Sequence, residues 1–206
     1  MTVNVEREMN ITPADWVPGP GQGHWTYDHY ASLPEDGKRY EIVDGVLLYM
    51  SPAPGISHQK AVLRLASYLL ALVENAGLGQ TFVSPIDVEL SPGTVFEPDI
   101  VVVLNAGRDK VTASHIVGAP DLVVEVLSPG TQRYDRTTKR EAYALAGIKE
   151  YWLVDPIAHT IETLFLLEGK AYRSVGVFSG QDRLVSKVIP TITEISVEQC
   201  FESVWS

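Results

Sequence analysis

The chain has 206 residues, of which 45% are hydrophobic, and it carries a formal net charge of −10. This length and apolar content fit one folded domain and exclude global disorder. The acidic balance argues against a protein that wraps DNA, because such proteins have a basic surface. Cys200 is the single cysteine, which excludes an intrachain disulfide and a cysteine-rich zinc site and fits a reducing compartment.

The first residues show no basic stretch followed by an apolar run, so we expect no signal peptide. No apolar stretch is long enough to cross a bilayer, and we predict a cytoplasmic protein without membrane contact. Prolines alternate with glycines before Trp25, a pattern that no regular element tolerates. We therefore expect an irregular N-terminal arm over residues 1–25 and a single domain over 26–206.

The N-terminal part of that domain begins with a short helix that Thr26 caps and that extends through Leu33. Residues 40–50 then predict a β-hairpin that turns at Asp44-Gly45, a favoured hairpin turn. Ser57 opens a strongly amphipathic helix, and Gly77 ends it.

The central and C-terminal elements alternate between strands and helices. Gly147 is expected to end the second long helix. The pattern predicts strands over 81–90, 97–104, 121–127 and 151–154, a helix over 133–146, and a C-terminal hairpin formed by 160–167 and 171–178. This order predicts an α/β domain with a mixed sheet flanked by helices.

Glu125 interrupts the apolar run 121–127, where alternation places it on the same strand face as Val123 and Leu127. A carboxylate in that position is costly unless it is paired or bound to a metal. Asp99 precedes a second apolar run in the same way. A divalent cation shared by Asp99 and Glu125 would remove their mutual repulsion, and Mg²⁺ prefers carboxylate and water ligands.

Lys139 lies one helical turn after Asp135, so both residues share a helix face. Their helix follows the Glu125 strand after a short turn at Ser128-Pro129-Gly130, so this face can point back across the strand ends. An ammonium there could hold a scissile phosphate or orient an attacking water, while the metal lowers the pKa of that water.

Several motifs together resemble the Uma-two family of proposed endonucleases, over a region from about Thr26 to Leu167. The resemblance implies a restriction-endonuclease-like fold, a PD-(D/E)XK-type site, Mg²⁺ or Mn²⁺, a bacterial cytoplasmic protein and often a homodimer. The residues that carry it are Tyr40 to Gly45, Ser51-Pro52, His58-Gln59, Glu97-Pro98-Asp99, Glu125 to Pro129, Tyr134-Asp135, Lys139 and Gly147 to Pro156.

By this resemblance Asp99 and Glu125 match the metal-binding acids of the motif. Leu127 stands where the PD-(D/E)XK motif usually has its lysine. The family resemblance places the corresponding lysine on the following helix, at Lys139. Glu41 and His58 also match family motifs, which implies an outer ligand or a base near the metal.

Each of these residues also has a plainer interpretation. Asp99 could cap a strand, and Glu125 could pair with an arginine. Lys139 could be a solvated helix lysine, His58 an exposed residue of a first helical turn, and Glu41 a hairpin residue bonded to a nearby cation. Their occurrence together, in this order, favours the metal site.

The leading functional hypothesis is a metal-dependent DNA endonuclease, with Asp99 and Glu125 as metal ligands and Lys139 steadying the developing charge. A second hypothesis is a weak or inactive nuclease fold that serves as a binding or dimerisation module, which the net acidity and Leu127 motivate. A third is action on RNA or another phosphodiester.

Overall fold

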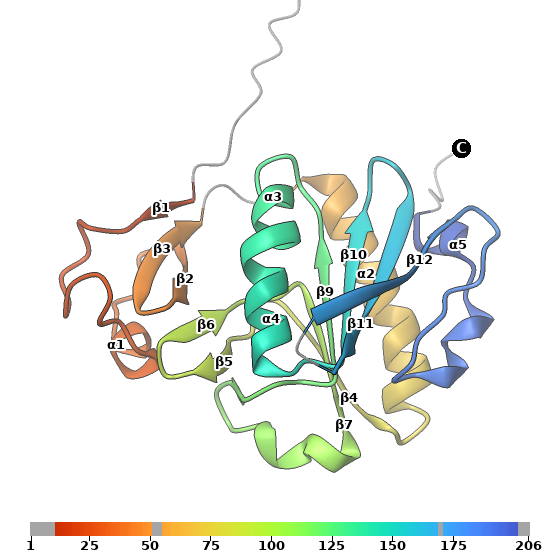
Figure 1. The fold of residues 1–206 in the computed structure, drawn as a ribbon, viewed down its shortest axis with the longest axis horizontal. Helices are drawn as coiled ribbons and strands as arrows, with labels where there is room; N and C mark the ends of the chain where they lie inside the picture. Colours follow the sequence, from red (N-terminus) through yellow and green to blue (C-terminus); the bar gives the residue numbers. More distant parts are fainter. Residues whose placement is uncertain (1–10, 51–54, 169–170, 202–206) are drawn as a thin grey trace, which may run out of the picture.

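Two six-stranded sheets form the core of the computed structural model, which describes residues 11–50, 55–168 and 171–201 (Figure 1). The first sheet has the order β1-β3-β2-β6-β5-β8. Its strands are β1 Thr12–Pro13, β2 Arg39–Val43, β3 Val46–Met50, β5 Val88–Ser91, β6 Thr94–Phe96 and β8 Ile116–Val117.

The second sheet has the order β12-β11-β10-β9-β7-β4 and mixes parallel and antiparallel pairs. Its central strands β9 and β10 are parallel and almost wholly buried. The strands are β4 Gly79–Val83, β7 Ile100–Leu104, β9 Leu122–Val126, β10 Glu150–Asp155, β11 Thr160–Leu167 and β12 Ala171–Ser179.

Helices cover both faces of the second sheet (Figure 1). Helix α2 (Ile56–Leu69), extended by a π-helical turn (Leu70–Glu74), packs on one face together with the C-terminal segment. A continuous helix packs on the other face and consists of α3 (Gln132–Tyr134), a π-helical turn (Asp135–Lys139) and α4 (Arg140–Ala146). The shorter helical elements are α1 Tyr27–Ala31, α5 Val197–Phe201 and the 3₁₀ turns Asn105–Lys110 and Pro190–Glu194.

The predicted α/β class, the mixed sheet between helices and the two hairpins are confirmed. Gly147 ends α4 in a left-handed conformation, as expected of a helix-terminating glycine. Asp44 and Gly45 both have positive φ, which is the geometry of the expected tight hairpin turn. The sequence indicated one sheet, however, whereas the strands divide between two.

The prediction of a single strand over residues 81–90 is wrong. The chain leaves the second sheet after Val83 and enters the first sheet at Val88. Pro85 has no backbone N–H to donate to a ladder, which favours a break at this point. The predicted strand over 97–104 also starts later, at Ile100, because Pro98 precedes it.

Part of the predicted irregular arm packs against the first sheet. Thr12 and Pro13 pair with β3, and Ala14 and Trp25 are buried. Residues 1–10 lie outside the described part of the chain, and the domain boundary at residue 26 remains a prediction. Across the described residues, no helix combines the length and apolarity needed to span a membrane.

Candidate active site

Asp99 and Glu125 lie on neighbouring strands of the second sheet. Strands β7 and β9 are antiparallel, with Ile100 opposite Val124, so the next pair outward sets Asp99 opposite Glu125. The backbone N–H of Val126 donates to Asp99 Oδ2 over 2.8 Å, which ties the two strands together at this point. Both carboxylates are buried. The alternation expected from the sequence thus leads to two acids side by side.

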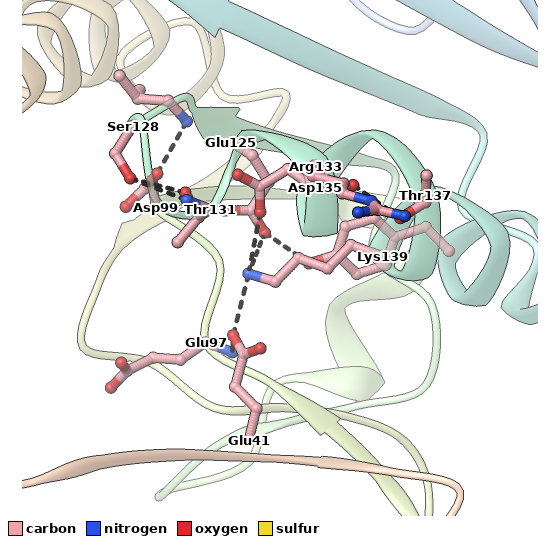
Figure 2. Close-up of polar contacts among 12 residues, drawn as sticks. Glu41, Glu97, Asp99, Glu125, Ser128, Thr131, Arg133, Asp135, Thr137 and Lys139 are labelled. Atoms are coloured by element: carbon pink, nitrogen blue, oxygen red, sulfur yellow. Dashed lines mark hydrogen bonds and ion pairs between the residues drawn. The ribbon is translucent and has the colours of Figure 1, made fainter. Parts of the chain in front are cut away.

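Lys139 enters the same region from the helix that covers this face. Its ammonium lies 2.8 Å from Glu125 Oε1 and 2.9 Å from Glu41 Oε1. Figure 2 shows the two glutamates approaching this ammonium from opposite sides. The Lys139 side chain is only 5% exposed, so its interpretation as a solvated helix lysine is wrong.

Lys139 is the last residue of the π-helical turn Asp135–Lys139. Such turns widen a helix locally and occur often at functional sites. Asp135 is buried with Lys139, and its Oδ1 lies 3.9 Å from the ammonium. One helical turn later, the Tyr143 hydroxyl donates to Glu125 Oε1 over 2.7 Å. The helix therefore supplies both an ammonium and a hydroxyl to one carboxylate oxygen.

Glu41 joins the site from β2 of the first sheet, so the site lies where the two sheets meet. Its Oε1 also accepts the backbone N–H of Glu97 over 3.2 Å. Within the described residues its other oxygen, Oε2, is buried without a hydrogen-bond partner. Glu41 is indeed bonded to a cation, as the plainer interpretation held, and that cation is Lys139.

His58 lies in the first turn of α2 and is buried, which overturns its interpretation as an exposed residue. Its Nε2 lies 3.1 Å from Asp99 Oδ2. In the described part of the chain, its Nδ1 is buried and has no partner. His58 therefore orients Asp99, and among the described residues nothing occupies its second ring nitrogen, which could bind a further group.

Negative charge exceeds positive charge in this cluster. Glu41, Asp99, Glu125 and Asp135 are four buried carboxyl groups, whereas Lys139 is the one buried amine. Burial raises the pKa of Glu125 to about 8 even though Lys139 lowers it, and burial raises the pKa of Asp135 to about 7. The cluster thus requires either bound protons or a further cation.

For Lys139, burial favours the neutral amine, but Glu125, Glu41 and Asp135 together raise its pKa well above the ordinary value. The amine is therefore charged at neutral pH. It has three N–H donors, one of which binds Glu125 Oε1, and Glu41 Oε1 lies at ion-pair distance from the same ammonium.

Comparison with known proteins shows the family of the chain. The family model Uma2, described as "Putative restriction endonuclease", matches residues 27–198. The chain belongs to the Uma2 family. A solved structure described as "a putative nuclease" from Anabaena variabilis ATCC 29413 is similar, with a TM-score of 0.68 and 22% identity over 85% of this chain and 97% of that chain. This likeness shows the fold, and no curated protein matches the chain.

The donors of this candidate site suit a hard divalent cation. Within the described residues, the hydrogen bonds to Asp99 and Glu125 use Oδ2 and Oε1, and the second oxygen of each accepts none. No three His, Cys, Asp or Glu side chains of residues 11–50, 55–168 and 171–201 are arranged to hold a metal by themselves. Two carboxylates completed by water and substrate oxygens are a common Mg²⁺ ligand set, so Asp99 and Glu125 fit such an ion.

Sequence reasoning did not identify Tyr143 as a member of the candidate site. It lies four residues after Lys139, on the same helix face, and this spacing was the available sign. Leu127, in the usual lysine position, packs in an apolar cluster with Val123 and Tyr143. Residue 127 therefore supplies no amine to Glu125, and the ammonium beside Glu125 belongs to Lys139 on the helix.

Proposed function

We propose that this protein is a metal-dependent DNA endonuclease that hydrolyses phosphodiester bonds. The observation that carries the proposal is the buried contact of Glu125 with Lys139 beside Asp99, with more carboxylates than one ammonium can neutralise. Membership of a family described as "Putative restriction endonuclease" supports the same reaction class. The finer assignments, to Mg²⁺ or Mn²⁺ and to DNA, are part of the proposal.

Asp99 and Glu125 would hold the ion through the oxygens that their protein partners leave free. His58 and the Val126 amide fix the orientation of Asp99. Lys139 and Tyr143 fix the orientation of Glu125 by binding its Oε1. Both carboxylates are therefore preorganised, which reduces the entropy lost when an ion and a substrate phosphate bind.

A bound Mg²⁺ or Mn²⁺ would lower the pKa of an attacking water and offset charge on the phosphate. Lys139 lowers the pKa of Glu125 and would favour its ionised form once a cation is bound, and its ammonium has N–H donors beyond the one that Glu125 accepts, which could bind a phosphate oxygen. Glu41 has a buried oxygen, Oε2, with no partner in the described chain, and this atom could accept a proton or bind a water. In this proposal Glu41 is an outer ligand or a base.

The test is nicking of supercoiled plasmid in Mg²⁺ and in Mn²⁺, followed by gel electrophoresis. Asp99→Ala, Glu125→Gln and Lys139→Met are each expected to reduce the rate by at least about a hundredfold, typical for loss of a preorganised electrostatic group. Asp121→Asn is the matched control. Asp121 is also a buried aspartate, but it directly precedes β9 and pairs with Lys149, at the opposite end of that strand from Glu125.

Equal nicking by the wild type and the three site variants would contradict the proposal. Calorimetry with Mn²⁺ provides a second measurement, in which Glu125→Gln should abolish binding and Asp121→Asn should not. A protein that binds Mn²⁺ and DNA without cutting would instead be a binding module. Single-stranded and double-stranded DNA and RNA of one sequence, compared in one assay, determine the substrate class.

A further inference from the structure

Arg39 is a partly exposed cation that is linked to the candidate site. It begins β2 two residues before Glu41, so both side chains lie on one strand face, about 7 Å apart along the strand. The Arg39 side chain is 41% exposed, whereas that of Glu41 is only 2% exposed. Arg39 therefore lies at the mouth of the cluster, and Glu41 lies inside it.

A hydrogen-bonded connection fixes Arg39 relative to the acids. Its Nε donates to Glu97 Oε2 over 2.5 Å. The backbone N–H of Glu97 donates to Glu41, and Glu97 precedes Asp99 by two residues, which keeps their Cα atoms within about 7 Å. Figure 2 shows the Glu97 carboxylate directed away from Lys139, toward the outside of the cluster.

Within the described residues, the two terminal nitrogens of Arg39 donate to no acceptor, because its one side-chain hydrogen bond uses Nε. Burial opposes the charge of this guanidinium, but Glu97, Glu41 and Asp99 raise its pKa above the ordinary value. Arg39 is thus a charged, planar guanidinium with unused N–H donors, and two such donors can bind two oxygens of a phosphate.

Lys139 alone cannot attract a DNA phosphate to the site. Its single charge is shared among Glu125, Glu41 and Asp135, and its side chain is only 5% exposed. An incoming polyanion would meet excess negative charge at the mouth of the site unless an exposed cation were there.

We propose that Arg39 binds a backbone phosphate of the DNA strand at the entrance to the site, through the terminal N–H groups that Glu97 leaves free. This inference rests on the proposed endonuclease function. Arg39 is a substrate-binding residue in this scheme, and Glu97 is the positioning residue that holds its guanidinium in place.

The experiment measures binding of a fluorescein-labelled 20-base-pair duplex by fluorescence anisotropy at several salt concentrations. Ca²⁺ replaces Mg²⁺, since it is a hard divalent cation with the same preference for oxygen ligands, and a gel checks that the duplex is intact. The variants are Arg39→Met and Arg39→Lys. Arg108→Met is the matched control, because Arg108 is exposed in the 3₁₀ turn beyond the far end of β7, about 17 Å of strand from Asp99.

Arg39→Met is expected to weaken binding about tenfold and to reduce the slope of log K against log salt concentration by about 0.9, the value for one lost phosphate contact. Arg39→Lys should retain the slope, because it retains the charge, but should weaken binding severalfold because the two-oxygen contact is lost. Arg108→Met should match the wild type. Melting temperatures measured alongside show whether each variant is folded.

Wild-type slope and affinity in Arg39→Met would overturn the assignment of Arg39 while leaving the endonuclease proposal intact, provided that Glu125→Gln still loses cleavage. Absence of both binding and cleavage in the wild type would instead overturn both proposals. If Arg39→Met does not fold, Arg39→Lys decides, because it preserves the ion pair with Glu97. Unchanged affinity in Arg39→Lys, with an unchanged melting temperature, would then count against the two-oxygen contact.

Discussion

The ammonium of Lys139 lies 2.8 Å from Glu125 Oε1, and both side chains are only 5% exposed. Removing one member of a buried ion pair leaves an uncompensated charge and typically costs about 3–5 kcal/mol. Lys139→Met should therefore lower the free energy of unfolding by about that amount, measured by urea denaturation at pH 8.5, above the Glu125 pKa of about 8. The loss should be at the upper end of this range, because Glu41 also loses its cation.

The double variant Lys139→Met/Glu125→Gln tests whether charge is the cause. It removes the cation together with one of the carboxylates, so it should be more stable than Lys139→Met alone. Arg136→Met is the control, because Arg136 forms a partly exposed pair with Glu162 and should cost less than about 1 kcal/mol. A double variant no more stable than Lys139→Met would show that lost packing, and not charge, dominates.

The stability of the metal-free protein should fall as pH rises from about 5 to about 8. Burial raises the pKa of Glu125 from the ordinary 4.5 to about 8, although Lys139 lowers it. Between these values the folded state retains a proton that the unfolded state releases, so unfolding becomes more favourable as pH increases. Asp135, with a pKa raised by burial to about 7, acts in the same direction.

Urea midpoints measured in EDTA at pH 5.5, 7 and 8.5 test this trend, and Glu125→Gln should make it shallower. Mn²⁺ should reverse part of it, because the cation binds ionised carboxylates and stabilises the folded state. A midpoint that rises between pH 6 and 8 in EDTA would contradict the expected direction.

Local sequence patterns predicted those relationships in the site that are set by residues close together in the chain. Strand alternation placed Glu125 inside the sheet, and helical spacing placed Asp135 and Lys139 on one helix face. Both relationships depend on a few consecutive residues and on fixed backbone periods. The structure brings these side chains to one place.

Relationships between distant segments were less accessible from the sequence. Glu41 reaches Lys139 only because the first sheet packs beside the second, and a sequence of strands does not show which strands pair. His58 came from a family motif, whereas its contact with Asp99 depends on how α2 packs on the sheet. The break after Val83 was missed because the alternation continues through it.

Gly45 connects the hairpin that carries Glu41 to the N-terminal segment. Its φ is +76°, and a Cβ added there would lie 2.5 Å from the carbonyl oxygen of Gly23. Gly45→Ala should therefore lower the free energy of unfolding by the cost of a positive φ, about 1 kcal/mol, plus the cost of moving the Gly23 backbone. The measurement is again urea denaturation.

Gly37→Ala separates these two costs. Gly37 has a similar φ of +73°, but an added Cβ there meets nothing within 4 Å. Gly37→Ala should show the backbone cost alone, and Gly45→Ala should exceed it. Because β2 leads into this turn, displacement of Gly45 should also shift Glu41 and reduce plasmid nicking, whereas Gly37→Ala should leave nicking unchanged. Equal losses of stability in the two variants would show that Gly23 moves aside at little cost, and the turn would then not fix the position of Glu41.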